Sequence, residues 1–192
     1  MKKYRFFGSL LDTQEKWLNK MASQGFRLVR VNKLLYEFEA CSPNEVQYCV
    51  EFIGEKSHKN AEDYRCFLEE LGYKVFYKNI NLNYSIGKVR VRPWAEKGGR
   101  IATNGTTYNR ELLIVEKMND GKPFEIHTSK EDLIRYYGTL RNPWLCFLAI
   151  FGAFGFVFKS LTFGAFAVAA LFPVILYQSK IAKVKKSLRY EE

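Results

Sequence analysis

The sequence has little of the chemistry that most catalytic and metal sites use. It contains only two histidines in 192 residues, and its four cysteines show no CxxC spacing. A zinc site needs several Cys or His ligands at close spacing, so the sequence predicts no metal site and no cofactor. The expected state of the cysteines is that of reduced structural thiols: Cys41, Cys49, Cys66 and Cys146.

Nucleophile and phosphate motifs are missing as well. No serine lies in a Gly-x-Ser-x-Gly elbow, and the glycines at Gly98-Gly99 and Gly105 lack the spacing that cradles phosphates. The paired carboxylates Glu37 and Glu39 alternate with Tyr36 and Phe38, which indicates a solvated strand face rather than acid-base catalysis. We therefore expect the protein not to be an enzyme.

Charge is nearly absent from one long stretch. Between Trp144 and Tyr177 the only charged residue of 34 is Lys159, and the N-terminus has no apolar signal region. A bilayer core of about 30 Å needs roughly 20 apolar residues in a helix, so two short spans of 15 and 17 residues fit better than one. The sequence predicts a membrane hairpin over 141–178 that turns at Lys159-Ser160.

Basic residues flank this hairpin. Arg141 precedes it, and a basic amphipathic tail over 179–192 follows it, with Ile181, Val184 and Leu188 at helical spacing. The positive-inside rule then places both termini in the cytoplasm, at the cell membrane. The residues expected to contact anionic lipid headgroups are Lys180, Lys183, Lys185, Lys186 and Arg189.

Two alternatives to a spanning hairpin stay open. Short length and Pro173 within the second segment are compatible with a monotopic hairpin that re-enters on the same side. A hydrophobic core hairpin of a soluble protein is the other alternative, but neither segment has the polar face that such a helix needs.

The remaining 140 residues suit one ordinary soluble domain. They carry 23 basic and 18 acidic side chains, whereas residues 141–192 carry seven basic and two acidic ones. Each part thus has a net charge of +5, and positive charge is densest at the membrane end.

An internal repeat runs through the soluble part. Three features recur with an offset of 46 to 48 residues: Phe6-Phe7-Gly8 as Phe52-Ile53-Gly54, Trp17 to Phe26 as Tyr64 to Tyr73, and Tyr36 as Tyr84. A near-constant offset of this size indicates a duplicated structural unit.

Each copy predicts the order strand, helix, strand, strand. The predicted strands are Tyr4–Phe7, Phe26–Val31 and Leu34–Ala40 in the first copy, and Val46–Phe52, Tyr73–Lys78 and Asn83–Arg92 in the second. Asp12 or Thr13 is expected to cap the first helix and Asn60 to begin the second. Gly25 and Gly72 are expected to end the two helices with positive φ. The fold class is therefore α+β, an antiparallel sheet with helices on one face over 1–92.

Residues 93–140 are expected to connect this domain to the membrane. Glu111–Lys117 and Phe124–His127 predict an appended hairpin around the turn at Asn119. Ser129 is placed to cap a final helix, Lys130–Leu140, that leads toward the bilayer.

The order of these motifs resembles the bacterial membrane-anchored family of domain of unknown function 2812. The residues that carry the resemblance are Phe6-Phe7-Gly8, Glu15 to Phe26, Tyr36 to Phe38, Val46 to Phe52 and Tyr64 to Tyr73. The resemblance implies transmembrane helices after the soluble domain and frequent pairing with a winged-helix repressor of the PadR type. It brings no known catalytic residues.

Aromatic residues of the repeat suggest a ligand site. The doubled topology also resembles that of bacterial effector-binding domains, which hold small ligands in a cleft between two copies. A tyrosine-lined cleft with a nearby carboxylate could hold a small amphipathic or cationic ligand. The candidate residues are Trp17, Tyr48, Glu51, Tyr64 and Tyr84.

A basic strand is a weaker indication, of nucleic-acid binding. Lys88, Arg90 and Arg92 alternate with valines, but a domain with 18 acidic residues does not promise the broad basic patch that nucleic acid requires. We predict a non-enzymatic, membrane-anchored sensor or interaction domain that binds a small ligand or a regulatory partner. The alternatives are an accessory subunit of a membrane protein complex and a small interfacial membrane enzyme.

Overall fold

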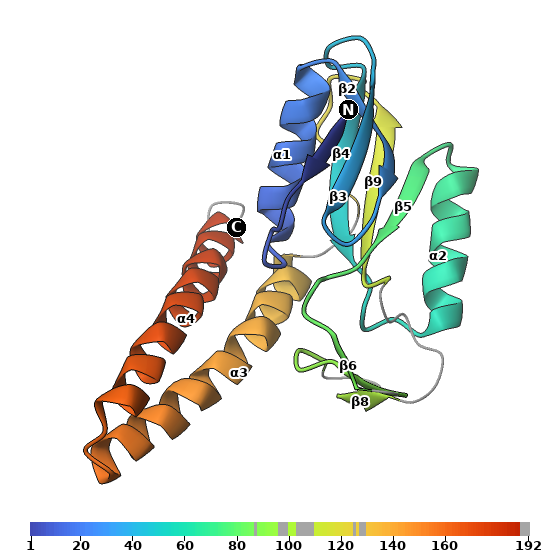
Figure 1. Cartoon of the computed structure of the whole chain (residues 1–192). Coiled ribbons are helices and arrows are strands. Elements are labelled where there is room, and N and C mark those ends of the chain that lie inside the picture. The colour runs from blue at the N-terminus through green and yellow to red at the C-terminus, as the bar shows by residue number, and fades with distance from the viewer. Residues whose placement is uncertain (87, 96–99, 103–109, 125, 127–129, 189–192) are drawn as a thin grey trace. The chain divides into compact units, whose positions relative to one another are not determined.

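The computed structural model describes all residues except 87, 96–99, 103–109, 125, 127–129 and 189–192. Its contacts divide the chain into two compact units, residues 1–127 and 128–192. The first unit is α+β with antiparallel sheets, and the second consists of two long apolar helices that form a hairpin (Figure 1). The predicted fold class is confirmed.

The first unit contains two sheets of three strands with the same strand order. The first sheet, β1-β3-β2, is formed by Lys2–Tyr4, Leu35–Ala40 and Phe26–Val31. The second sheet, β4-β9-β5, is formed by Val46–Phe52, Leu112–Met118 and Lys74–Lys78. In each sheet the strand that comes last in the chain lies in the centre, which is the arrangement that a duplicated unit would give.

In each sheet, one helix follows the strand that comes first in the chain. Helix α1 (Leu11–Ser23) packs on the first sheet through Trp17, whose ring meets those of Tyr36 and Phe38. Helix α2 (His58–Glu70) packs on the second sheet, where its buried Ala61 and Leu68 meet Leu113 and Val115 of β9. Alternate residues of a strand point to the same face, so β9 presents these two side chains together to α2.

Helix α1 also covers the free edge of β4. The Asn19 amide accepts from the backbone N–H of Tyr48 at 2.8 Å and donates to the carbonyl oxygen of the same residue at 2.8 Å. The Glu15 carboxylate accepts from the N–H of Val50 at 3.0 Å, and burial raises the pKa of Glu15. Side chains thus take the place of a neighbouring strand, which protects an edge that would otherwise be open to pairing.

The helix starts differ from the predictions. Helix α1 begins one residue before Asp12, and its N-cap residue, Leu10, makes no side-chain cap bond. Helix α2 begins at His58 instead of Asn60, because Ser57 is the cap and its hydroxyl accepts from the Asn60 N–H at 3.1 Å. The first strand is Lys2–Tyr4 and not Tyr4–Phe7.

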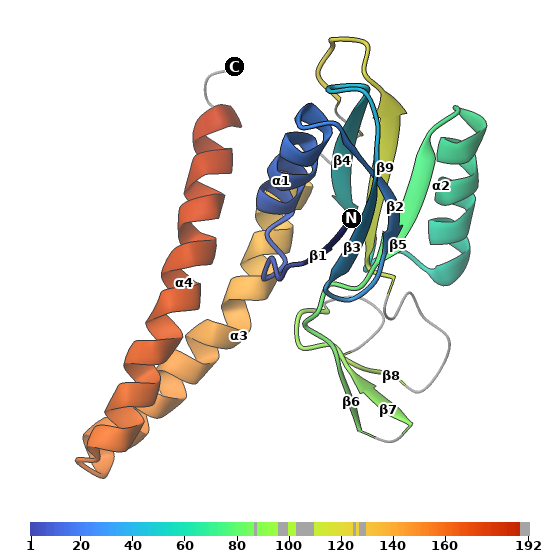
Figure 2. The same cartoon turned by 45° about the horizontal axis from the view of Figure 1, so that its top comes forward.

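The last strand of the second copy was placed wrongly. Residues 83–92 do not join the second sheet but form β6 (Tyr84–Ile86) and β7 (Val89–Val91), which pair with β8 (Ile101–Ala102) in a small third sheet (Figure 2). The predicted pairing of Glu111–Lys117 with Phe124–His127 is also wrong, because β9 pairs with both β4 and β5. Residues 125 and 127 of the second predicted strand lie outside the described residues. The chain from 79 to 111 is therefore an insertion between the last two strands of the second set.

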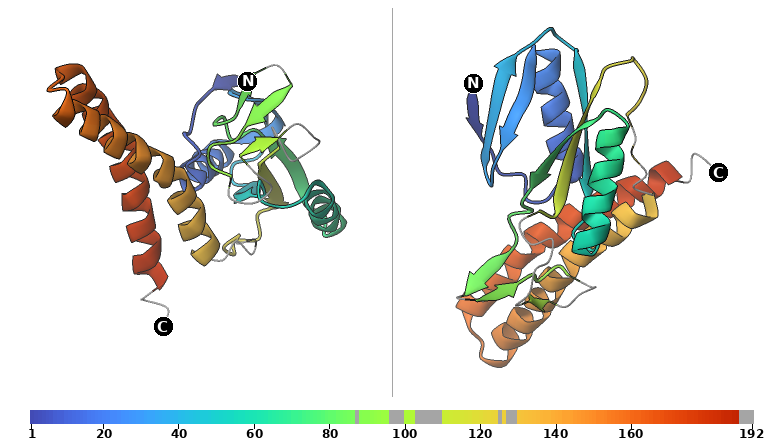
Figure 3. Two further views of the ribbon diagram at one scale, coloured as in Figure 1. Left: turned by 90° about the horizontal axis from the view of Figure 1, so that it is seen from below. Right: turned by 90° about the vertical axis from the view of Figure 1, so that its right-hand side faces the viewer.

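The second unit is a helical hairpin, α3 (Lys130–Val157) and α4 (Leu161–Leu188), whose helices pack against each other (Figure 3). The predicted helix Lys130–Leu140 does not end before the apolar stretch but continues through Pro143 to Val157. Ser129, its predicted cap, lies outside the described residues. Both helices are long and apolar enough to cross a membrane.

Candidate functional site

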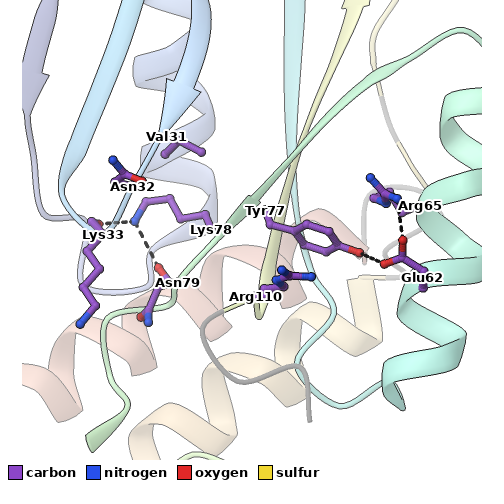
Figure 4. Close-up of a pocket in the computed structure, with 9 residues that line it drawn as sticks. All are labelled: Val31, Asn32, Lys33, Glu62, Arg65, Tyr77, Lys78, Asn79 and Arg110. Atoms are coloured by element: carbon purple, nitrogen blue, oxygen red, sulfur yellow. Dashed lines mark hydrogen bonds and ion pairs between the residues drawn. The ribbon is translucent and has the colours of Figure 1, made fainter. Parts of the chain in front are cut away.

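A polar pocket of about 580 Å³ lies in the first unit between the ends of β2 and β5 (Figure 4). Its lining comes from the turn after β2, from α2, from β5 and from the chain that enters β9. Residues of both predicted copies therefore contribute to it. We call it the basic pocket and define it by its charged and aromatic lining residues: Lys33, Glu62, Arg65, Tyr77, Lys78 and Arg110.

One side of the basic pocket is built around Tyr77. Its hydroxyl donates to the Glu62 carboxylate at 2.8 Å, and the same carboxylate meets the Arg65 guanidinium at 2.5 Å (Figure 4). The guanidiniums of Arg65 and Arg110 lie 5.7 and 5.1 Å from the centre of the Tyr77 ring. Cations at these distances from an aromatic ring are held by its quadrupole.

These contacts shift the protonation of the two acids involved. Burial, together with the bond to Glu62, raises the pKa of Tyr77 to about 12. The hydrogen bonds from Tyr77 and Arg65 hold the pKa of Glu62 below its ordinary value. At neutral pH, Tyr77 is therefore a neutral phenol and Glu62 a carboxylate.

The other side of the basic pocket holds a buried lysine. Lys78 is 3% exposed, and its ammonium group donates to the carbonyl oxygens of Lys33 at 2.6 Å and of Asn79 at 3.2 Å (Figure 4). The ammonium also lies 5.5 Å from the centre of the Tyr36 ring. Burial lowers the pKa of Lys78 to about 8, and the charge of Glu111 opposes this shift.

The lining carries four basic side chains and one carboxylate. Within the described part of the chain, only Arg65 of these four forms an ion pair, with Glu62 and with Glu69. Lys33, Lys78 and Arg110 have no carboxylate at ion-pair distance among those residues. A pocket with such a surplus of positive charge attracts anions.

Tyr48, a predicted ligand residue, belongs to a different and closed network. It is 1% exposed, its hydroxyl donates to the buried Glu116 at 2.8 Å, and it accepts from the backbone N–H of Leu28 at 2.7 Å. Arg27 completes the network with an ion pair to Glu116 at 2.6 Å. Every bonding partner of the Tyr48 hydroxyl is thus a protein group, and burial raises its pKa.

The structure brings two of the predicted residues together. The Tyr64 hydroxyl donates to the Glu51 carboxylate at 2.7 Å, on the surface where α2 meets the second sheet. Glu51 is buried and Tyr64 half-buried, and burial followed by this bond raises the pKa of Tyr64.

Trp17 and Tyr84 lie elsewhere. Trp17 packs in an aromatic cluster with Phe7, Tyr36 and Phe38. Tyr84 is on β6 in the small third sheet and is 60% exposed. Of the five predicted ligand residues only Glu51 and Tyr64 lie together, and none of the five lines the basic pocket.

The predicted lipid-binding residues lie on the last part of α4. Lys183, Lys185 and Lys186 are exposed, and Lys180 is half-buried. Arg189 lies outside the described residues. Residues 179–188 of the basic tail are a continuation of α4 and not a separate helix.

The residues of the basic pocket were missed from the sequence for a physical reason. They come from a turn, a helix, a strand and a loop that only the folded chain brings together, so no local spacing identifies them. Lys78 gave the one usable signal, since it follows Val75, Phe76 and Tyr77 on a strand where a lysine is unusual.

Cysteine chemistry gives little support for catalysis. All four cysteines are free, and burial raises the pKa of Cys49 to about 12. Such a thiol stays protonated at neutral pH and is a poor nucleophile. In the described part of the chain, no three His, Cys, Asp or Glu side chains gather as a metal site would require.

A model of the family described as a protein of unknown function (DUF2812) matches residues 11–149. No curated protein and no solved structure matches the chain. The matched range includes every strand except β1 and all lining residues of the basic pocket, and it ends inside α3.

Proposed function

We propose that this chain, which belongs to the DUF2812 family, is a membrane-anchored domain that binds a small ligand in the basic pocket and catalyses no reaction. The observation that carries the proposal is the pocket itself, which lies between the two sheets and is lined by residues of both. A ligand there would contact both sets of strands at once. Its binding would therefore favour one spacing of the two sheets over another.

The titratable groups of the pocket suit binding better than catalysis. A general acid or base works best when its pKa is near the working pH. The pKa of Tyr77 is raised and that of Glu62 is lowered, so both move away from neutral pH. The two side chains are hydrogen-bonded to each other. Lys78 titrates nearer to neutrality, but two carbonyl oxygens hold its ammonium group in place.

Anchoring rests on the apolar surface of the hairpin. Large apolar side chains such as Phe156, Leu161 and Phe172 are 87%, 92% and 73% exposed on α3 and α4. Apolar surface of this extent is stable in lipid but not in water. The lysines at the end of α4 add attraction to anionic headgroups, which supports the proposal that both termini lie on the cytoplasmic side.

The test is a ligand screen on the full chain in lipid nanodiscs. A panel of anionic, neutral and cationic metabolites is added, and the melting temperature is followed by fluorescence. Asn32 lines the pocket and is exposed, so Asn32→Trp should fill the pocket mouth and remove any stabilisation. Asn60→Trp, an exposed asparagine on α2 outside the pocket, is the matched control.

Loss of stabilisation in Asn32→Trp but not in Asn60→Trp supports the proposal. If no compound stabilises the parent protein, or if both variants respond like the parent, the pocket is not a ligand site.

A protein partner is the second candidate. Phe67 and Leu71 are both 54% exposed and lie four residues apart, at the end of α2 and just beyond it. Two large apolar side chains on one exposed face are typical of protein contacts. A stoichiometric partner that co-purifies with the parent from membranes, but not with Phe67→Ser/Leu71→Ser, would support an accessory subunit of a membrane complex.

A further inference from the structure

The ammonium group of Lys78 has an unused donor. A lysine ammonium carries three N–H groups, and two of them meet the carbonyl oxygens of Lys33 and Asn79. Among the described residues the third makes no hydrogen bond. Carbonyl oxygens satisfy hydrogen bonds without neutralising charge, and Glu111, whose charge acts on this buried cation, forms no ion pair with it among the described residues.

Arg110 is a second cation that lines the basic pocket. Its guanidinium lies against the Tyr77 ring at 5.1 Å, and the Tyr77 hydroxyl is fixed by Glu62. Stacking uses the face of the guanidinium and leaves its edge N–H groups available, in the fork that matches a phosphate or carboxylate. Arg110 is exposed and has no carboxylate partner within the described part of the chain.

The single carboxylate of the lining cannot balance these charges. Glu62 already accepts from Tyr77 and pairs with Arg65. Lys33, Lys78 and Arg110 therefore leave an excess of three positive charges around a cavity of about 580 Å³. One carboxylate group would compensate a single charge. A phosphate monoester carries about −1.5 to −2 at pH 7 and has three acceptor oxygens.

We infer that the basic pocket binds a phosphate-type head group, with Lys33, Lys78 and Arg110 as its anion-binding residues. This inference rests on the proposed function and specifies the ligand class. The head group can belong to a soluble phosphate compound or to a phospholipid. Both sources share the chemistry of a polyvalent tetrahedral anion, which balances the excess positive charge of the lining and accepts hydrogen bonds from the N–H groups of Lys78 and Arg110.

The experiment uses the full chain in phosphatidylcholine nanodiscs, with pyrophosphate as the soluble probe and titration calorimetry as the readout. Lys33→Gln and Arg110→Gln each remove one exposed cation of the pocket without disturbing the core. Each variant should weaken binding by about tenfold, which is the cost of one charge-assisted hydrogen bond. Lys59→Gln removes an exposed cation of α2 outside the lining and should bind like the parent.

A second set of nanodiscs distinguishes the two sources. If a lipid head group occupies the pocket, phosphatidic acid in the disc should weaken pyrophosphate binding in the parent, whereas phosphatidylserine at equal amount should not. If the ligand is soluble, the two discs give the same affinity. Either result supports the inference, provided that Lys33→Gln and Arg110→Gln are impaired.

Three results would overturn it. Equal affinity in the parent and in both pocket variants, or equal loss in Lys59→Gln, would mean that pyrophosphate only screens surface charge. Failure of pyrophosphate to bind, while a neutral or cationic compound stabilises the parent and not Asn32→Trp, would refute the ligand class but leave the proposed function standing. Failure of every compound of the panel would refute both.

Discussion

Two buried tyrosines of the first unit differ only in what their hydroxyl groups meet. The Tyr48 hydroxyl makes two hydrogen bonds, to Glu116 and from the Leu28 N–H. Tyr36 is 0% exposed, and its hydroxyl has no hydrogen-bond partner among the residues that the structure describes. An unpaired buried polar group costs free energy, whereas a paired one contributes to stability.

Replacing each tyrosine by phenylalanine tests this difference. Tyr48→Phe leaves the Leu28 N–H unpaired and weakens the support of a buried carboxylate, so it should lower the free energy of unfolding by about 3 kcal/mol. Tyr36→Phe removes an unpaired hydroxyl and should change it by less than about 0.5 kcal/mol or stabilise the protein. Urea unfolding of the full chain in detergent measures both. Equal losses would contradict the two assignments.

Tyr48 and Tyr64 show the limit of sequence reasoning at this scale. Tyrosine was assigned to a ligand cleft because its hydroxyl needs a partner when buried. The partner of Tyr48 is Glu116, 68 residues away, on a strand whose place in the sheet was not predicted. The partner of Tyr64 is Glu51, which was named as a nearby carboxylate. Local residues could be paired from the sequence, but distant ones could not.

Lys78 gives a prediction about pH. Its pKa is about 8 in the folded protein and 10.5 ordinarily, so between these pH values the unfolded chain binds more protons. Stability contributed by this residue must therefore increase as pH rises from 8 to 10.5, by about 3 kcal/mol in total. The charge of Glu111 acts on it, and the Tyr36 ring lies 5.5 Å from its ammonium group.

The measurement compares the parent with Lys78→Met over this pH range, because other lysines titrate equally in both proteins. As the pH rises, the free energy of unfolding of the parent should increase relative to that of Lys78→Met. Parallel curves would mean that Lys78 keeps an ordinary pKa.

At the scale of elements, the two helix ends are the best-marked positions of the predicted repeat. Gly25 and Gly72 have φ of +80° and +84°, which confirms the predicted positive values. At the end of α2 the Gly72 N–H donates to the carbonyl oxygen of Glu69, and the Tyr73 N–H donates to that of Leu68. These two bonds form a Schellman motif, which satisfies carbonyl groups that the helix leaves open.

The two glycines should nevertheless respond differently to alanine. Each substitution costs about 1 kcal/mol because a side chain disfavours positive φ. A Cβ at Gly25 would lie 2.9 Å from the carbonyl oxygen of Cys41, whereas a Cβ at Gly72 would meet no atom within 4 Å. Gly25→Ala should therefore lower the melting temperature clearly more than Gly72→Ala. A larger loss in Gly72→Ala would contradict this reading of the helix ends.

Strand order shows which information a sequence lacks at this scale. Strand β9 begins with the apolar run Leu112–Val115, a pattern typical of a central strand buried on both faces. It was paired with a neighbouring segment because adjacent strands are the commonest partners. The insertion from 79 to 111 separates β9 from β5, and residues 83–92 have the alternation of a strand. The hydrophobic pattern indicates where the strands are. Their order in the sheet depends on pairing between distant segments, which the pattern does not contain.

At the scale of the whole molecule, the apolar length of the hairpin is the quantity that matters. The apolar part of α4 from Leu161 to Tyr177 has 17 residues, or about 26 Å, slightly less than a bilayer core of about 30 Å. Arg141 donates to Gln178 at 2.6 Å, so the polar residues that border the two apolar segments lie at one level. Lys159, at the turn between the helices, can reach the opposite headgroups by extending its side chain.

A spanning hairpin and a re-entrant one make different predictions for the turn. If the hairpin spans with both termini in the cytoplasm, an impermeant thiol reagent added to intact cells should label Lys159→Cys. The same reagent should label Lys186→Cys only after permeabilisation, since Lys186 is exposed near the end of α4. Both variants require a background in which the four native cysteines are replaced. A mismatch of about 4 Å is small enough for local thinning of the bilayer, so a spanning arrangement is the expected outcome. Protection of Lys159→Cys in intact cells, together with labelling after permeabilisation, would establish the re-entrant form, and labelling of Lys186→Cys in intact cells would reverse the topology.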